Sequence, residues 1–351
     1  MENSAKKRAP LPAAAVTVTG VIALLVTAVV SIYVGSTSIA ISDVVRSLLV
    51  FCGLAPRDSV NPAVYLAVTS IRLPRVICGV LAGGGLAISG AVMQGVFRNP
   101  LADPGLLGVS AGAGFGALLA FKTGLASLFL LPAFSFAGSL AAVASIIGIA
   151  FAVRGGRTSS ITLVMSGMAV SALFSAFTSV LLTLSNEYQV NNYIFWTLGG
   201  LSNRRWEHAG TMALPVLLSA ALLLLLLGRL DVMMLGDEQA KALGVNSGQN
   251  RVVMIMLSSL CTASIVCVTG PIGFVGLMVP HIMRLIVGPS HRLLCAASFF
   301  AGGVFLTLCD SLIRWFSRFN AREFSVGIIT ALLGAPFFLF LLVKKSGSAP
   351  E

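Results

Sequence analysis

The chain has 351 residues, of which 57% are hydrophobic and 10% are charged, and its mean hydropathy is +0.96. A soluble protein of this length needs more polar surface than such a composition supplies, so the soluble classes are excluded. The net charge of +11 at pH 7 comes from 23 Lys and Arg against 12 Asp and Glu. In a chain that lies in a lipid bilayer, the distribution of this basic charge between the loops indicates the orientation of the protein.

A transmembrane helix needs about 20 predominantly apolar residues to cross the hydrocarbon core. Nine runs almost free of charge cover residues 9–42, 76–97, 104–121, 123–153, 158–186, 208–228, 252–284, 293–309 and 324–343. The run 252–284 is too long for one span and contains Gly270-Pro271-Ile272-Gly273, so we divide it into helices at 251–270 and 276–288. The sequence therefore predicts an all-α polytopic membrane protein with about ten transmembrane helices in a single domain, residues 1–351.

Basic residues at the two ends of the chain set the predicted orientation. Lys6, Lys7 and Arg8 precede an apolar segment that is longer than the core of a signal peptide, about 7–15 residues, so a retained helix is expected. The positive-inside rule then places a basic tail, residues 1–11, in the cytoplasm. Ten spans return Lys344 and Lys345 to the same side, so both termini are predicted to be cytoplasmic.

Under this topology, thirteen basic residues lie on the inner side and ten on the outer side. Two interpretations of this weak bias stay open. The orientation is set mainly by the two ends of the chain, or the outer face is basic because an acidic partner docks there.

Several kinds of chemistry lack a recognisable pattern in this sequence. The six cysteines form no CxxC pair and the three histidines are scattered, so no metal or cofactor site is predicted. A GxxxxGK[ST] phosphate loop is also missing. Asp310 and Glu323 are expected near outer helix ends, where water reaches them, so the spans offer no carboxylate for ion coupling. Any pumping therefore needs an energy source on another chain.

The longest predicted inner loop, residues 229–251, reads RLDVMMLGDEQAKALGVNSGQNR. The charged residues Asp237 and Lys241 lie beside Ala240 and Leu243, which are at helical spacing and form a small apolar face. Gly244 is placed to end a short helix. Such a helix is suited to docking a cytoplasmic partner, and the alternative is a solvated loop.

The predicted outer loop 186–205 reads NEYQVNNYIFWTLGGLSNRR and carries four aromatic residues between polar clusters. Aromatic side chains at this depth are typical of an interfacial belt. The piece from Asn192 to Leu198 is also suited to capping a central cavity as a short apolar turn. Both interpretations remain open.

The stretch 89–116, SGAVMQGVFRNPLADPGLLGVSAGAGFG, lies inside the membrane region and does not follow a strand, so a nucleotide-binding glycine loop is excluded. Gly108, Gly112 and Gly116 recur every four residues and predict one helix face that a neighbouring helix approaches closely. Residues 99–104, NPLADP, predict a turn between two helices.

Four blocks together resemble the FecCD-type permeases over about 270 residues. In chain order these blocks read IRLPRVICGVLAGGGLAISGAVMQGVFRNPLADPGLLGVSAGAG, LGDEQAKALGV, TGPIGFVGLMVPHIMRL and GIITALLGAPFFLFLL. Members of this family are membrane subunits of type II ABC importers for iron-siderophore complexes, haem and cobalamin.

The resemblance implies the type II importer permease fold and a transport subunit of the bacterial inner membrane rather than an enzyme. The partners it implies are a second permease subunit in a homodimer or a close heterodimer, two cytoplasmic ATPase subunits that bind ATP and Mg²⁺, and a periplasmic substrate-binding protein. This chain is then expected to bind no cofactor and no nucleic acid.

The resemblance also assigns roles to matching positions. Arg72 and Arg314 correspond to arginines that meet acidic residues of the binding protein. The ATPase-coupling segment lies in the loop 229–251, with Gly236, Asp237, Ala240, Leu243 and Gly244 at the ATPase groove. The segment 186–205 corresponds to the periplasmic gate.

The cytoplasmic gate corresponds to Asn99 and Leu101 together with the turn at Ser159 and Ser160. Candidate residues lining the transport path, on the helices expected to be fifth and tenth, are Ser166, Ser171, Ser175, Thr178, Ser325 and Thr330. One departure from the family is Glu323-Phe324-Ser325, where relatives often have Glu-Leu-Pro. Without that proline, the resemblance does not determine the residue at which the last helix begins.

The expected function is therefore a permease for an iron(III)-siderophore or haem, moved by alternating access that a separate ATPase drives. The alternatives are cobalamin as the substrate, with molybdate and other chelates also open, or an ion-coupled secondary transporter of a similar metal chelate. A structural or signalling membrane protein is disfavoured because the sequence shows no soluble output domain.

Overall fold

The computed structural model describes residues 13–35, 37, 39–154, 160–319 and 324–346, which are helical or in loops, without a strand among them. In the first half the elements are α1 (Ala13–Tyr33), α2 (Ile41–Phe51), η1 (Arg57–Ser59), α3 (Pro62–Leu66), the π-helical η2 (Ala67–Arg72), α4 (Leu73–Val96), η3 (Pro104–Leu107), α5 (Val109–Lys122), α6 (Leu130–Arg154) and α7 (Ser160–Thr183). In the second half they are α8 (Glu187–Thr197), α9 (Trp206–Met233), α10 (Asp237–Ala242), α11 (Ser247–Thr269), α12 (Val275–Val287), α13 (His291–Phe316) and α14 (Val326–Ser346).

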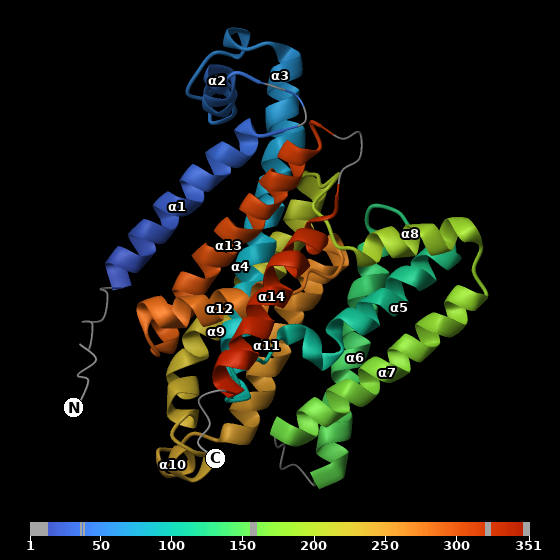
Figure 1. The fold of residues 1–351 in the computed structure, drawn as a ribbon, viewed down its shortest axis with the longest axis vertical. Coiled ribbons are helices and arrows are strands. Elements are labelled where there is room, and N and C mark those ends of the chain that lie inside the picture. Colours follow the sequence, from blue (N-terminus) through green and yellow to red (C-terminus); the bar gives the residue numbers. More distant parts are fainter. Residues whose placement is uncertain (1–12, 36, 38, 155–159, 320–323, 347–351) are drawn as a thin grey trace.

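Ten of these helices correspond to the ten predicted apolar segments, which confirms the all-helical prediction. Seven are long and apolar enough to cross a membrane, and three shorter apolar helices cover Val109–Lys122, Val275–Val287 and Val326–Leu341. The helices lie side by side between a cap formed by α2 and α3 and an opposite end that carries α10 (Figure 1). We name these the α2 end and the α10 end.

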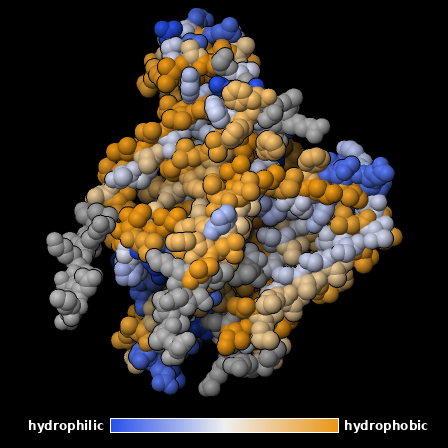
Figure 2. Space-filling model, in the orientation of Figure 1, coloured by the Kyte–Doolittle hydropathy of each residue, from blue (hydrophilic) through white to orange (hydrophobic). Residues whose placement is uncertain are grey.

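The surface follows the pattern expected of a protein embedded in lipid. Figure 2 shows apolar residues across the middle of the visible face, and hydrophilic residues gathered toward the α2 end, the α10 end and the region of α8. Large apolar side chains such as Leu225, Ile161 and Leu332 are exposed on α9, α7 and α14. Because a bilayer removes such side chains from water, their exposure in the isolated chain is compatible with a folded protein.

Helix α4 occupies the centre of the bundle. Together with α3 and η2 it forms a continuous helical segment, Pro62–Val96, in which 89% of the apolar window is buried. It packs against α9, α11, α12 and α13. A Cβ atom at Gly83 would overlap the carbonyl of Gly302 in α13, and one at Gly90 would overlap the carbonyl of Gly276 in α12. Glycine therefore lets α4 meet both neighbours through main-chain contact.

Helices α5, α6, α7 and α8 form a second group, drawn in teal to green in Figure 1. Gly112 and Gly116 face α6, where a Cβ atom would overlap the carbonyls of Gly138 and Phe134. Gly108 differs from the prediction, because it lies before α5 with φ +68° and caps its start instead of packing on the helix face. The turn that begins at Pro104 is a separate 3₁₀ helix, so the regular helix begins five residues later than predicted.

The central glycine contact gives the first testable prediction. In α4, Gly90→Ala forces α4 and α12 apart and is expected to destabilise the protein by about 3 kcal/mol, the upper part of the range for overpacking. The measurement is the midpoint of thermal unfolding in detergent micelles.

The matched control is Gly148→Ala in α6, because a Cβ atom there meets no other atom within 4 Å. This control is expected to raise stability by up to about 1 kcal/mol through helix propensity. Equal unfolding midpoints for the two variants would contradict the proposed backbone contact.

Candidate functional site: a transport path and its two ends

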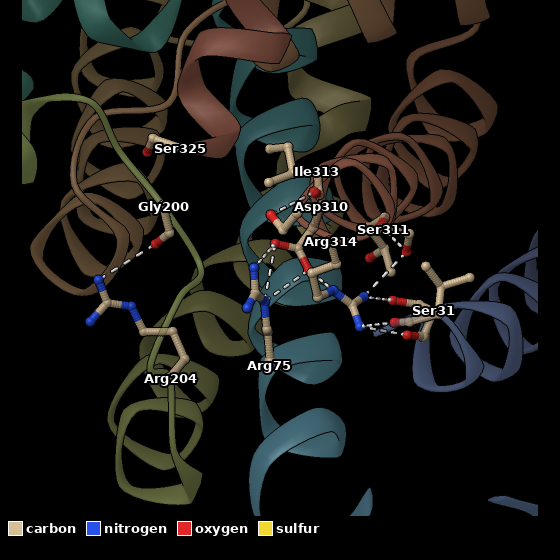
Figure 3. A network of polar contacts seen from close by, with 12 residues as sticks. Ser31, Arg75, Gly200, Arg204, Asp310, Ser311, Ile313, Arg314 and Ser325 are labelled. Atoms are coloured by element: carbon tan, nitrogen blue, oxygen red, sulfur yellow. Dashed lines mark hydrogen bonds and ion pairs between the residues drawn. The ribbon is translucent and has the colours of Figure 1, made fainter. Parts of the chain in front are cut away.

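A buried charge cluster joins α4 to α13 near the α2 end (Figure 3). Arg75 donates to both oxygens of Asp310, through Nη2 at 2.8 Å and Nε at 3.0 and 3.1 Å. Arg314, one helical turn after Asp310, donates to the same carboxylate at 3.0 Å. The Asp310 side chain is 3% exposed, so the expectation that water reaches it is wrong. Two guanidinium groups hold this carboxylate instead of water.

Arg72 and Arg314 both bind the end of α1. Arg72 donates to the carbonyls of Ile32 and Tyr33 at 2.7 and 3.1 Å, and Arg314 donates to the carbonyl of Ser31 at 2.7 Å. The last carbonyls of a helix lack partners within that helix, and these guanidinium groups supply them. The cluster therefore fixes α1 to α4 and α13.

This placement bears on the predicted docking role of the two arginines. Arg72 is 7% exposed and Arg314 is 5% exposed, so neither offers its charge to a partner in this structure. Among the described residues, the exposed arginines at the α2 end are Arg46, Arg57, Arg205 and Arg318. The docking role of Arg72 and Arg314 stays a prediction, and substituting either one would also disturb the attachment of α1.

The segment predicted as a gate contains a regular helix, α8, and not a short turn. Asn186 and Gln189 form a reciprocal capping box at its start. Along α8, Tyr188 and Phe195 are 75% and 73% exposed, while Tyr193 and Trp196 stack on each other and are half-buried. The aromatic residues therefore divide between the protein surface and the packing of α8 on the bundle.

The end of α8 meets the end of α11 and the start of α14 through main-chain contacts. Gly200 N donates to Thr269 O at 2.7 Å, and Gly327 N donates to Gly199 O at 3.1 Å. We name Gly199, Gly200, Gly270 and Gly327 the glycine junction.

Two members of the glycine junction require glycine for conformation as well as for space. Gly199 has φ +64° and Gly270 has φ +71°, and a Cβ atom on either would overlap a neighbouring carbonyl. The sequence contains these glycines in three separate segments, and no local pattern indicates that they meet.

A groove of about 550 Å³ opens beside the glycine junction. The residues that line it are Thr197, Leu198, Pro271, Gly327, Ile328, Ala331, Leu332, Ala335 and Pro336. Among these described lining residues none is charged, and Thr197 carries the one hydroxyl. The groove offers a smooth, neutral wall with few groups that hold a ligand tightly.

The predicted path-lining residues do not line this groove. Ser325 donates to the carbonyls of Leu198 and Gly199 and so contacts the glycine junction, and Thr330 is fully buried. On α7, Ser166 and Thr178 are buried, Ser171 is half-buried and Ser175 is exposed. Hydroxyl side chains also bond within their own helix, which a sequence does not distinguish from lining a path.

Arg204, in the loop between α8 and α9, lies near the glycine junction and the charge cluster. Its Nη2 donates to Gly200 O at 3.5 Å, as Figure 3 shows. Burial lowers the pKa of this guanidinium from its ordinary value. A partly desolvated positive charge therefore lies beside the glycine junction.

At the α10 end, the predicted coupling segment forms the expected short helix. Gly236 precedes it with φ +127°, and Ala240 is fully buried against the bundle. Gly244 has φ +78° and donates to Lys241 O at 3.0 Å. Together with a bond from Val245 N to Ala240 O, this forms a Schellman cap, so the helix end predicted from Gly244 is confirmed. Leu243 is 62% exposed at the tip of this segment.

The two predicted parts of the inner gate are described to different extents. Asn99 is exposed and its side-chain oxygen accepts from Leu101 N at 3.0 Å, which shapes the turn after α4. Ser159 lies outside the described residues. Ser160 begins α7, but its side chain is outside the described part of the chain.

Among the residues that the structure describes, no three His, Cys, Asp or Glu side chains come close enough to hold a metal ion. The ten apolar helices define a polytopic membrane protein. Residues 23–344 match the FecCD transport family, and the chain belongs to this family of ABC-importer permeases.

Known relatives agree with this assignment. The chain is 43% identical over 276 residues to the cobalamin import system permease of Halobacterium salinarum, covering 78% of this chain and 73% of that protein. It is 37% identical over 292 residues to the hemin transport system permease of Yersinia pestis, covering 82% and 86% of the two chains. A metal-chelate-type ABC transporter solved in an inward-facing conformation superposes with a TM-score of 0.82 at 32% identity, covering 94% of this chain and 99% of that one.

The buried charge cluster gives the second testable prediction. Asp310→Asn leaves Arg75 and Arg314 without their shared counter-charge, and is expected to destabilise the protein by about 3–5 kcal/mol. Thermal unfolding in detergent provides the measurement. Asp58→Asn, an exposed carboxyl at the same end, is the matched control and is expected to change stability by less than about 0.5 kcal/mol. Similar unfolding midpoints for the two variants would show that the cluster is not required.

Proposed function

We propose that this chain forms the translocation path of a type II ABC importer for an iron complex, an iron(III)-siderophore or haem. A periplasmic binding protein delivers the complex at the α2 end. Two ATPase subunits, which bind ATP and Mg²⁺, act at the α10 end. The complete transporter contains two permease subunits in a bacterial inner membrane, with both termini of this chain in the cytoplasm.

The uncharged groove beside the glycine junction carries this proposal. A small oxyanion is recognised by converging N–H groups or cationic side chains, and the described lining residues supply neither a charge nor a cluster of side-chain donors. A bulky chelate, in contrast, presents a large organic surface that slides along Leu, Ala, Pro and Gly. The groove therefore favours chelates over bare anions.

The geometry of α10 supports an external ATPase. Its buried Ala240 anchors the helix on the bundle, while the exposed Leu243 is available to a cleft on a partner. Since the sequence contains no phosphate loop, ATP hydrolysis is assigned to that partner.

Cobalamin is a second candidate substrate, because the relative at 43% identity is a cobalamin import permease and the neutral groove suits that ligand equally well. Ion-coupled transport is disfavoured, because the carboxylate of Asp310 is held by two arginines and so is not poised to bind a coupling ion.

The substrate proposal gives the third testable prediction. Cells that depend on this importer are expected to take up ⁵⁵Fe-siderophore or labelled haem, and uptake is expected to stop when ATP is depleted but to persist when the proton gradient is collapsed. Labelled cobalamin and molybdate are the comparison substrates. Uptake of cobalamin alone would transfer the assignment to the second candidate, and uptake driven by the proton gradient would refute the ABC mechanism.

The coupling segment gives the fourth testable prediction. Gly244→Leu places a side chain at φ +78°, which costs about 1–2 kcal/mol in the left-handed region. Transport-coupled ATP hydrolysis is therefore expected to fall roughly 5- to 30-fold, while the permease reaches the membrane at normal levels. ATP hydrolysis is measured in proteoliposomes that contain the complete transporter.

Gly244→Asn is the matched control, because asparagine tolerates the left-handed conformation better than leucine does. It is expected to retain most of the activity. Normal coupling in Gly244→Leu would count against this segment as the ATPase contact.

A further inference from the structure

The residue that follows the last turn of α4, Arg98, adopts an unusual conformation. Its φ is +50°, and the described chain contains two other non-glycine residues with positive φ. Non-glycine residues are uncommon in this left-handed region, and here it forms a Schellman cap of α4, in which Arg98 N donates to Gly95 O and Asn99 N to Gln94 O. Its guanidinium donates to Met233 O at the end of α9 and to Asp237 Oδ1 at 3.3 Å. Arg98 therefore connects the loop after α4 to α9 and α10.

Asp237, the first residue of α10, is shared between two arginines. Besides Arg98, it accepts from Nη2 of Arg251 in α11 at 3.2 and 3.4 Å. The Arg251 side chain is 8% exposed, whereas those of Asp237 and Arg98 are 58% and 42% exposed. One partner of Asp237 is therefore fixed in the bundle, and the other lies on a loop at the surface.

The loop that Arg98 begins is the one that contains the predicted gate residues. Arg98 N donates to Gly95 O, and Asn99 N donates to Gln94 O at 3.1 Å, so both residues continue directly from the end of α4. Leu101 follows two residues later and is held by the Asn99 side chain. A displacement of the Arg98 guanidinium therefore acts on a segment whose backbone contacts are few and local.

We propose that Asp237 is a positioning residue that transmits movement of α10 to the loop 98–101 through Arg98, with Arg251 as the fixed reference on α11. This proposal rests on the function proposed above, in which a partner ATPase moves α10. Asp237 accepts from both arginines in this structure. When α10 moves, the half-exposed contact with Arg98 changes first, and the loop is released or drawn in with it.

The strength of the contact fits this role. A half-exposed ion pair shifts an equilibrium by roughly up to fivefold, because water screens the charges. Such a contact is made and broken at low cost in each transport cycle. A fully buried pair, such as the one at Asp310, would instead lock the two elements together.

The test measures how the loop responds to nucleotide in the permease–ATPase complex reconstituted in nanodiscs. A reporter cysteine, Leu101→Cys, is introduced in a Cys52→Ser background, because Cys52 is the exposed cysteine and the other five are buried. The alkylation rate by N-ethylmaleimide is measured without nucleotide and with ATP plus vanadate. The ratio of the two rates reports how strongly the ATPase controls the loop.

The reference protein carries Leu101→Cys and Cys52→Ser and keeps Asp237 and Arg98. Its alkylation rates with and without ATP plus vanadate are expected to differ, so their ratio is clearly different from one. Asp237→Asn keeps the shape of the side chain and removes its charge, and is expected to bring this ratio roughly two- to fivefold closer to one. Arg98→Gln is expected to bring the ratio of alkylation rates equally close to one. The double variant is expected to show the same ratio as either single variant, because all three lack the same contact. Glu238→Gln, which makes the same charge change on the next residue of α10, is the matched control and is expected to keep the reference ratio.

The outcomes separate this inference from the proposed function. If Asp237→Asn and Arg98→Gln bind the ATPase and keep the reference ratio, the inference is overturned and the proposed function stands. If the reference ratio is one, or if the effects of the two variants add, the loop is not controlled through this pair and the inference is also overturned. If no ATPase co-purifies with the reference protein, the proposed function itself fails, and the inference fails with it.

Discussion

The contact of α4 with its neighbours through main-chain atoms is the constraint on which the rest of this structure depends. In a bilayer, apolar helices gain little from leaving lipid for one another, so their association relies on close packing. The glycines at Gly83 and Gly90 bring α4 within main-chain contact of α13 and α12. Since α4 runs through the bundle, the same helix positions Arg75 near one end and Arg98 beyond the other.

The polar contacts at the two ends of α4 differ in burial and therefore in what they do. At the α2 end, Asp310 is held by Arg75 and Arg314 out of reach of water, and Arg314, together with Arg72, also satisfies the last carbonyls of α1. Breaking such a cluster leaves buried charges uncompensated, so it fixes helices in place. At the α10 end, the contact between Arg98 and Asp237 is half-exposed, so it contributes little to stability and is able to change.

Between these ends, the glycine junction links the parts expected to form the path. It ties the end of α8 to α11 and α14 by main-chain hydrogen bonds, and the neutral groove opens directly beside it. The end of α8 is therefore attached to both α11 and α14. This chain belongs to the FecCD family of permeases, and the neutral groove is the part of it to which the proposed transport function refers.

The sequence by itself determined the class of the protein, the number of apolar helices and the short helix ended by Gly244. These features depend on local composition and spacing, because helix formation and its caps involve residues only a few positions apart. The helix Asp237–Ala242 and the packing face of Gly112 and Gly116 could be predicted for the same reason.

Only the tertiary structure decided which polar groups are buried and what they bind. Asp310 lies near a helix end in the sequence and was therefore expected to meet water, yet distant segments of the chain cover it, as they cover Arg72. Gly108 fits a helical repeat and instead takes a left-handed conformation, and the side chain of Ser325 bonds the carbonyls of Leu198 and Gly199, which no local pattern indicates. The buried charge cluster brings together residues far apart in the chain. The same is true of the three glycine segments that meet and of the two arginines that share Asp237. Hydrophobic spacing carries no information about such pairs.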